Sequence, residues 1–340
     1  MNHSSNDAGV FKVNPDKTLT QLLGTSGSGY MSVDGVGTAA HFTQPAGMTV
    51  DGSSLYVVDV TGAIRRVDLS TLAVTTPIGI AQSNAVNGTG ANASVYIPTA
   101  LLVLDAGTLL VGDTMGAIDG VTLPSGQLTL SAGTVGYNDA LDGVGPAAHV
   151  RPDGFATDAS GAIYFNGHAS VRRYDPATGK VDTLAGQDDA SGSADGTGSA
   201  ARFYSAAGIA TDGNGNLYVS DTLNSTIRKV VIATGEVTTF AGAAQVPGGV
   251  DGIGDAARFN LPNGIVYDGK GSLYVADTDN GAIRRIEIAT RGVTTYAGVL
   301  GQQGLQPGGL PARLNRPKGV AVLPNGDLAV TDEQAVVVVH

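Results

Sequence analysis

Residues 251–298 read DGIGDAARFNLPNGIVYDGKGSLYVADTDNGAIRRIEIATRGVTTYAG, and this stretch decides the fold. Four short runs in it are rich in Val, Ile, Tyr and Thr, which favour β-strands, and they lie at 265–268, 273–277, 283–288 and 293–298. Gly-containing segments separate the first run from the second and the third from the fourth, as expected for hairpin turns. The stretch therefore predicts one antiparallel unit of four strands, which we name a to d in chain order.

The same unit recurs about every 54 residues along the chain. Its turn glycine falls at Gly47, Gly154, Gly208, Gly264 and Gly319, with Ala100 in the second place. The Asp that ends strand b falls at Asp59, Asp113, Asp221, Asp277 and Asp332, with Gly167 in the third place. Self-similarity at such a period is typical of solenoids and propellers. Four strands repeated six times predict an all-β fold, a six-bladed β-propeller of four-stranded antiparallel blades, because radial closure protects the sheet edges.

A single domain is expected for the 340 residues, because the repeat extends over nearly the whole chain. The last unit ends in a third strand at 335–340 with no fourth behind it, whereas residues 10–13 and 18–24 match strands c and d. We therefore expect the N- and C-terminal strands to share one blade and close the ring. Which terminus supplies strand c of that blade stays open, because both carry a candidate. The blades are expected at 34–79, 87–133, 142–186, 195–242, 251–298, and 313–340 together with 8–24.

Two runs of the repeat resemble NHL repeats. One reads Pro-Asn-Gly-Ile at 262–265, Gly-Ser-Leu-Tyr-Val-Ala-Asp at 271–277 and Asn-Gly-Ala-Ile-Arg-Arg-Ile at 280–286, and the other follows the same pattern at 208–230. The resemblance extends over nearly the whole chain, and the long Asp-Gly-x-Gly-x-Ala-Ala-Arg-Phe loop is similar to a bacterial style of the repeat. It implies a propeller that binds proteins, RNA or ligands on one face. Related six-bladed propellers include hydrolases and lyases, among them an amidating lyase with a His-ligated metal in its channel, but no comparable His is evident in the inner strands of this chain.

Composition argues against several classes of function. The net charge of −11 disfavours a nucleic-acid partner, which requires a basic footprint. The chain has no Cys, so it can form no disulfide, thiolate metal site or Cys nucleophile. Membrane insertion is not expected, because no apolar run approaches roughly 18 residues, and residues 1–7 lack the apolar region of a signal peptide. The resemblance nevertheless implies an extracellular or periplasmic protein, and nothing in the sequence indicates an oligomeric state.

Two recurring loop patterns predict structural roles. Asp-Gly-x-Gly begins at Asp34, Asp142, Asp195 and Asp251, with a near copy at Asn87. We interpret it as a turn that needs positive φ, with an Asp that caps local N–H groups, and the alternative is a Ca²⁺ site built from the Asp and backbone carbonyls. A loop Arg also accompanies the strand-b Asp in the last three blades, and its guanidinium fork could hold either the Asp carboxylate or backbone carbonyls and so pin the loop to the rim. The predicted pairs are Arg202–Asp221, Arg258–Asp277 and Arg313–Asp332.

The third blade departs from this pattern. His149 replaces the loop Arg, Gly167 replaces the strand-b Asp, His168 follows it, and Arg151 and Asp153 lie in the same shortened loop. A His with a carboxylate can perform general acid–base chemistry or bind a metal. If the chain is an enzyme, it would be a lyase or hydrolase with its site at the channel mouth, with or without a metal, and His149, His168 and Asp153 would be catalytic. The other interpretation is a drifted repeat whose loop is held by different hydrogen bonds.

The residue before each turn glycine should line the mouth of the central channel, because strand a is innermost in a propeller. These residues are Ala46, Thr99, Asp153, Ala207, Asn263 and Lys318. A concave mouth with a few converging polar groups is the default ligand site. We therefore predict a non-enzymatic binding or scaffold protein that recognises a protein, peptide or glycan on the rim formed by the d–a and b–c loops. No catalytic residue and no cofactor is expected, with Ca²⁺ or Zn²⁺ as the alternative, and the predicted ligand-binding residues are Asp153, Asn263, Lys318, Arg151 and His41.

Overall fold

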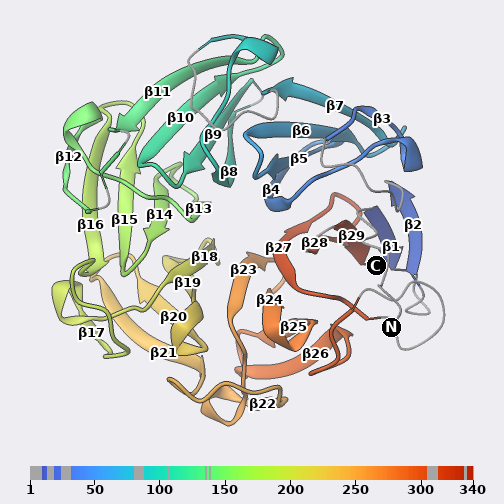
Figure 1. The fold of residues 1–340 in the computed structure, drawn as a ribbon. Helices are drawn as coiled ribbons and strands as arrows, with labels where there is room; N and C mark the ends of the chain where they lie inside the picture. The colour runs from blue at the N-terminus through green and yellow to red at the C-terminus, as the bar shows by residue number, and fades with distance from the viewer. Residues whose placement is uncertain are drawn as a thin grey trace.

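The computed structural model describes residues 10–13, 19–23, 32–79, 88–105, 107–134, 136–137, 139–304, 313–332 and 335–339. Within these ranges the strands form six sheets placed radially around a central channel (Figure 1). The helical elements of this part of the chain are single 3-10 turns, and none is long and apolar enough to cross a membrane. They are η1 (Gly37–Ala39), η2 (Gly90–Asn92), η3 (Gly145–Ala147), η4 (Gly198–Ala200), η5 (Thr222–Asn224), η6 (Gly254–Ala256) and η7 (Thr278–Asn280).

Five of the sheets are each formed by one continuous stretch of chain. From the channel outward, the first contains β4 (Pro45–Asp51), β5 (Ser54–Asp59), β6 (Ala63–Asp68), β7 (Ala73–Ile78) and β3 (Gly35–Val36). In the same direction, the second contains β8 (Pro98–Asp105), β9 (Thr108–Asp113), β10 (Ala117–Thr122) and β11 (Gln127–Gly133). The third contains β13 (Gly154–Thr157), β14 (Ile163–Gly167), β15 (Ser170–Asp175), β16 (Lys180–Gly186) and β12 (Gly143–Val144).

The remaining sheets follow the same order. The fourth contains β18 (Ala206–Thr211), β19 (Asn216–Asp221), β20 (Thr226–Val231), β21 (Glu236–Gly242) and β17 (Gly196–Thr197). The fifth contains β23 (Pro262–Tyr267), β24 (Ser272–Asp277), β25 (Ala282–Glu287), β26 (Gly292–Gly298) and β22 (Gly252–Ile253). The last contains β27 (Pro317–Val322), β28 (Leu328–Asp332), β29 (Ala335–Val339), β1 (Val10–Val13) and β2 (Leu19–Leu23).

The innermost strands form a closed ring. Strands β4, β8, β13, β18, β23 and β27 each contact the next, and β27 contacts β4. Figure 1 shows these six strands around the channel, with the other strands of each sheet outside them. Any residue that recurs at the start of the innermost strand is therefore brought to one end of the channel.

The predicted fold class, six equivalent four-stranded antiparallel blades, is wrong in the number of continuous blades and in their strand composition. Only five blades are continuous, antiparallel sheets, and four of these contain five strands, because a two-residue strand from the preceding loop pairs with the outermost long strand. The remaining sheet is a composite in which β1 pairs with β29 in parallel. The propeller therefore consists of five self-contained blades closed by a mixed sheet, and the six equivalent four-stranded antiparallel blades expected from the sequence are not formed.

The composite sheet joins strands from both termini, as Figure 1 shows where the two ends of the chain meet. Strand β29 pairs with β28 on one side and with β1 on the other, and β2 lies outermost against β1. The C-terminal segment thus supplies the third strand. The N-terminal strand that was expected for the same position, β1, pairs with β29 as the fourth strand, so both strands are present in the sheet.

Apolar clusters between neighbouring blades form the core. Between the third and fourth sheets, for example, Tyr164 and Val171 pack with Phe203, Leu217 and other buried side chains. Because both faces of each sheet are covered by a neighbouring sheet, the strands need apolar side chains on both sides, which explains the nearly continuous apolar runs.

The turn glycines permit close approach of the inner strands. A Cβ built on Gly208 would lie 2.3 Å from the carbonyl oxygen of Asn263 in the next blade, and one on Gly264 would lie 2.5 Å from that of Lys318. Real Cβ atoms do not tolerate such distances. The recurrence of this glycine in the sequence therefore reflects packing around the channel, and the residue just before it is held at the channel wall.

Candidate functional site

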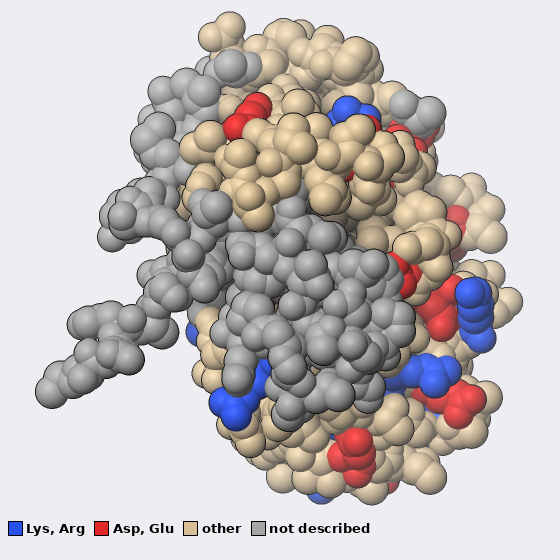
Figure 2. Space-filling view, turned by 90° about the vertical axis from the view of Figure 1, so that its right-hand side faces the viewer, with Lys and Arg blue, Asp and Glu red and all other residues tan. Residues whose placement is uncertain are grey.

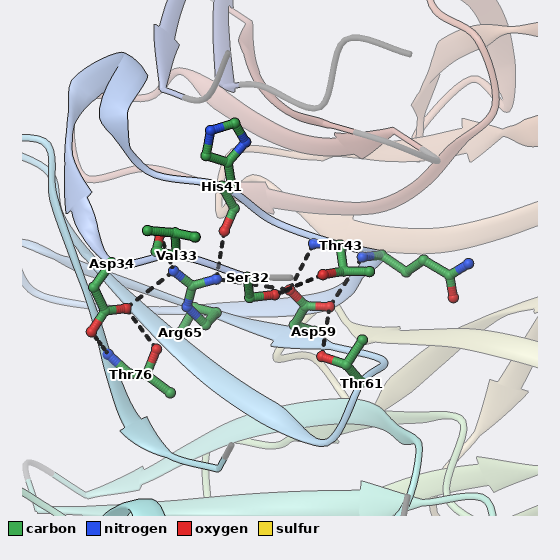
Figure 3. Close-up of polar contacts among 10 residues, drawn as sticks. Ser32, Val33, Asp34, His41, Thr43, Asp59, Thr61, Arg65 and Thr76 are labelled. Carbon is green, nitrogen blue, oxygen red and sulfur yellow. Dashed lines mark hydrogen bonds and ion pairs between the residues drawn. The ribbon is translucent and has the colours of Figure 1, made fainter. Parts of the chain in front are cut away.

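A buried arginine in the third strand of the blade organises the rim loops (Figure 3). In the first blade, Arg65 is fully buried and donates to the His41 carbonyl at 2.7 Å and to Asp34 at 3.1 Å. It also lies 3.8 Å from Asp59, which accepts hydrogen bonds from the backbone N–H groups of Thr43 and Gln44. One guanidinium thus joins the loop before the blade to the end of its second strand.

The same network recurs in the fourth and fifth blades with shorter ion pairs. Arg228 lies 2.8 Å from Asp221, and Arg284 lies 2.7 Å from Asp277. The second amino group of each guanidinium lies 2.7 Å from the Asp of the preceding Asp-Gly-x-Gly loop. Each planar fork therefore bridges two carboxylates, a geometry that suits arginine and not lysine.

Of the two roles expected for the loop arginines, the structure shows the bonds to backbone carbonyls, and the pairing with the strand-b aspartates is wrong. Arg202 donates to the carbonyls of Ser199 and Ala201 within its own loop, and Arg258 does the same with Asp255 and Ala257. Among the described residues, Arg313 forms no ion pair with Asp332. The arginines that pair with the strand-b aspartates recur at the third position of the third strand. A charged residue that recurs within an otherwise apolar strand was the sequence signal that indicated this network.

The Asp-Gly-x-Gly loops are turns held by protein groups. Gly37, Gly145, Gly198 and Gly254 all have φ between +55° and +59°, as the turn interpretation predicts. Each aspartate accepts hydrogen bonds from a Thr on the outermost long strand in addition to the buried Arg, for example Asp251 from Thr295. The carboxylates are therefore engaged in the structural network, and the part of the chain that the structure describes holds no cluster of three potential metal-ligating side chains.

The mouth of the channel is a cavity of about 410 Å³. Apolar side chains such as Met48, Leu101, Phe155 and Ile265 form much of its wall. The six residues that precede the turn-glycine positions all line it, as the repeat predicts, and Arg151 lines it as well. The polar residues that line it are Thr99, Arg151, Asp153, Ser205, Asn263 and Lys318.

Opposite charges face one another across this cavity. Asp153 precedes β13 and Lys318 lies in β27, and these strands are three places apart in the ring of six inner strands. Asn263 on β23 is adjacent to Lys318, since the two strands are neighbours. Lys318 forms no ion pair with another described residue. The mouth therefore presents an ammonium and an amide on one side and, on the other, a carboxylate with the Arg151 guanidinium near it.

Burial raises the pKa of Asp153 to about 6. The nearby Arg151 guanidinium and a hydrogen bond from the His168 backbone N–H oppose this effect, whereas the negative charge of Asp188 adds to it. The carboxylate is thus ionised at neutral pH but poorly solvated, and a cationic ligand group would find it in a partly desolvated state.

The three residues of the enzyme hypothesis are not brought together. The His149 ring is directed to Asp139, with 2.7 Å between Nδ1 and Oδ1, and it stacks on Tyr137 at 4.0 Å between ring centroids. His168 is exposed, has a φ of +22° and meets Asp153 through its backbone. Neither histidine lines the channel cavity with Asp153.

His41, the fifth predicted ligand-binding residue, also lies outside the channel cavity. Its carbonyl belongs to the Arg65 network, and its ring points away from Arg65 and Asp59 in Figure 3. Of the predicted ligand-binding set, the structure therefore gathers Arg151, Asp153, Asn263 and Lys318 in one cavity and leaves His41 on the rim.

The fold and the cavity define a β-propeller with a polar channel mouth, and comparison with known proteins identifies its repeat. Residues 259–286 match the NHL repeat family. NHL repeat-containing protein 2 of Bos taurus is 33% identical over 120 residues, which cover 33% of this chain and 16% of that protein. Protein SUPPRESSOR OF QUENCHING 1, chloroplastic, of Arabidopsis thaliana is 32% identical over 146 residues, which cover 41% of this chain and 14% of that protein. The chain carries an NHL repeat, and the predicted resemblance is confirmed.

The aligned stretches span only about a sixth of the length of these relatives. Among solved structures, an auxiliary nutrient binding protein from Bacteroides thetaiotaomicron superposes with a TM-score of 0.67 at 17% sequence identity, covering 94% of this chain and 79% of that one. At this identity the likeness establishes the propeller fold, and function must be argued from the site.

Proposed function

We propose that this propeller is a binding protein that holds a short peptide or a peptide terminus in the channel mouth. The observation that carries the proposal is the placement of Lys318 and Asp153 on opposite sides of one cavity of about 410 Å³. A peptide with free ends supplies a carboxylate for Lys318 and Asn263 and an ammonium for Asp153. A neutral glycan supplies neither charge, so the charge pattern favours a peptide among the three ligand classes expected from the sequence.

The apolar wall supports the same proposal. Met48, Phe155, Ile209 and Val320 separate the charged groups around the cavity. Pockets that combine apolar walls with a few placed polar groups are typical of small-ligand sites. The apolar residues would contact side chains of the peptide while the charged groups fix its direction.

The surface charge supports recognition of a specific ligand over general electrostatic binding of charged polymers. Figure 2 shows one side of the molecule, and in its coloured part acidic and basic residues lie close together among uncharged ones. The net charge of −11 disfavours a polyanionic partner. A location outside the cytoplasm, expected from the resemblance, belongs to the same proposal and is tested by fractionation of the producing cells.

The test is a calorimetric titration of the whole chain with trialanine and with its N-acetylated, C-amidated derivative. We expect trialanine to bind and the blocked peptide to bind at least about tenfold more weakly, because a buried charge left unpaired is costly. Lys318→Met and Asp153→Asn should each weaken binding similarly, whereas Lys270→Met, an exposed lysine in a hairpin turn, should have no effect. Equal binding of both peptides, or equal loss with Lys270→Met, would contradict the proposal.

The ionisation of Asp153 predicts how binding depends on pH. Its pKa is about 6, so its negative charge is lost as the pH falls through that value. If Asp153 holds the peptide ammonium, affinity for trialanine should fall between pH 7 and pH 5. The Asp153→Asn variant, which carries no charge at either pH, should lack this dependence.

A further inference from the structure

The b–c loops of the fourth and fifth blades are tied to the loop before the blade by an asparagine. In the fourth blade, the Asn224 side-chain amide donates to the Gly192 carbonyl at 2.7 Å and to Asp221 at 2.8 Å. In the fifth, Asn280 donates to the Gly248 carbonyl and to Asp277 at the same distances. The asparagine thus closes the space between the two loops.

The third blade lacks both side chains of this tie. Its turn from the second to the third strand has only two residues between Gly167 and Ser170, whereas four lie between Asp221 and Thr226 in the fourth blade. The strand-b Asp is Gly167, and no asparagine follows it. Asp139 stands three residues before the Asp-Gly-x-Gly loop, where the other two blades have the accepting glycine. These changes remove the side chains that fill this place elsewhere.

A cavity of about 470 Å³ lies at this place in the third blade. Asp139 borders it from the loop before the blade, and Asp188 and Asp189 border it from the loop after the blade. Asp188 accepts a hydrogen bond from the Ala169 backbone N–H at 3.0 Å, and Asp189 is exposed. No lysine or arginine is among the residues that line it, so the cavity is acidic.

A buried hydroxyl without a partner contributes to the same wall. Ser170 is 1% exposed and lines the cavity, and its Oγ makes no hydrogen bond to any residue that the structure describes. Buried polar groups are normally hydrogen-bonded, so an orphan of this kind in a cavity wall points to a missing partner. The equivalent hydroxyl of Thr226 in the fourth blade is also unpaired among the described residues, and in the third blade the unpaired hydroxyl lines the acidic cavity.

We propose that this cavity of the third blade is a second binding site, specific for a primary ammonium group such as a lysine side chain or a small amine. An ammonium is compact and carries three N–H donors, which match the Ser170 hydroxyl and the surrounding carboxylates. Of the three carboxylates, that of Asp189 is exposed, that of Asp188 accepts the Ala169 N–H, and that of Asp139 contacts His149. The described residues of this cavity do not form a metal-ligating cluster. An organic cation fits this donor set and volume better than a bare metal ion.

This site is a different cavity from the one proposed to hold a peptide at the channel mouth. The two cavities are separated by the b–c loop of the third blade, since His168 donates its backbone N–H to Asp153 and Ala169 donates to Asp188. Both cavities are proposed to take an ammonium, and the Asp188 charge raises the pKa of Asp153, so variants separate the two tests. Asp153→Asn should weaken trialanine binding and leave n-butylammonium binding within about twofold, whereas Asp189→Asn should do the reverse.

The test titrates the whole chain with n-butylammonium and with tetramethylammonium, followed by calorimetry and by amide chemical shifts. n-Butylammonium should bind and shift amides near Ala169, whereas tetramethylammonium, a cation without N–H donors, should bind at least about fivefold more weakly. Equal binding of the two cations, or absence of n-butylammonium binding at millimolar concentration, would overturn the proposal.

Two variants locate the site. Asp189→Asn should weaken n-butylammonium binding, whereas Glu236→Gln, an exposed acid on the fourth blade that alters the net charge by the same amount, should not. Ser170→Ala should also weaken binding about fivefold while it leaves the melting temperature equal or higher, because it removes an unsatisfied buried hydroxyl. Loss of stability in Ser170→Ala without loss of amine affinity would assign the hydroxyl a structural role and overturn the proposal.

Discussion

At the scale of single residues, the blades differ most in which residue occupies the third position of the third strand. Four blades place an arginine at the third position of the third strand, at Arg65, Arg172, Arg228 and Arg284, and all four are 0–1% exposed. The second blade has Asp119 there instead, 5% exposed, and keeps Asp113 nearby. Two carboxyl groups thus occupy a place where the first, fourth and fifth blades balance acid with base, and burial raises the pKa of both.

The pKa of Asp119, raised to about 7 by burial and by the neighbouring Asp113, predicts a pH-dependent stability. The unfolded chain releases this proton near pH 4, so between about pH 4 and 7 the folded state binds more protons and stability falls as the pH rises. Asp119→Asn should therefore increase the free energy of unfolding at pH 8 by on the order of 3 kcal/mol and change it little at pH 4.

The measurement is urea unfolding of both proteins at several pH values. Asp105→Asn, at an exposed turn position of the same blade, provides the control because its side chain only caps a turn. An Asp119→Asn protein with unchanged or reduced stability at pH 8 would show that the carboxylate has a compensating partner.

The buried arginines should be far more sensitive to substitution than their neighbours. Arg284→Ala would leave Asp277 buried without its cation and should lower stability by about 3–5 kcal/mol. Arg285→Ala, at the next residue, removes only hydrogen bonds to Ser272 on the exposed face and should cost about 1 kcal/mol or less. Chemical denaturation of the two variants measures the difference. Equal losses of stability would contradict a specific role for the buried arginine and indicate a general requirement for arginine in this strand.

At the scale of elements, the inner strands approach one another so closely that their glycines are predicted to be irreplaceable. Gly208→Ala would place a Cβ 2.3 Å from the Asn263 carbonyl oxygen, so either strand must move and the ring must deform. We expect a loss of about 1–3 kcal/mol, in the range of overpacking substitutions. Gly107→Ala is the control, because its Cβ would meet only ordinary contacts at 3.7 Å or more. Similar melting temperatures for both variants would show that the inner strands have more freedom than this packing implies.

The elements were the part of the structure most accessible from sequence. In the fifth blade, for instance, the predicted strands 273–277 and 293–298 are within one residue of β24 (Ser272–Asp277) and β26 (Gly292–Gly298). Runs rich in Val, Ile, Tyr and Thr, separated by Gly-containing turns, identify such strands from local sequence. The two-residue strands such as β22 were missed, because they form only when a loop meets the outer strand of its own blade, and that contact is not visible in local sequence.

The site was only partly predictable for a related reason. The residues that line the channel mouth were predicted from the repeat, because the same position of every blade lies at the same end of the channel. The arginine pairing was misassigned because Arg258 and Arg284 both recur with the repeat, and spacing does not reveal which side chain reaches Asp277. The cavity of the third blade depends on what a shortened turn leaves unfilled, and that requires the three-dimensional positions of the neighbouring loops.

At the scale of the whole molecule, the ring is closed by strands from both ends of the chain, and its stability should depend on that closure. Without β1 and β2, strand β29 would present an unpaired edge, which invites pairing with another chain. Deletion of residues 1–23 should therefore lower the melting temperature by several degrees and produce concentration-dependent association, measured by calorimetry and by light scattering. Deletion of residues 1–9 alone, which keeps both strands, should do neither. An unchanged melting temperature and a monodisperse product after the longer deletion would show that the five continuous blades and the three C-terminal strands hold the ring by themselves, and that the parallel β1–β29 pair adds nothing to its closure.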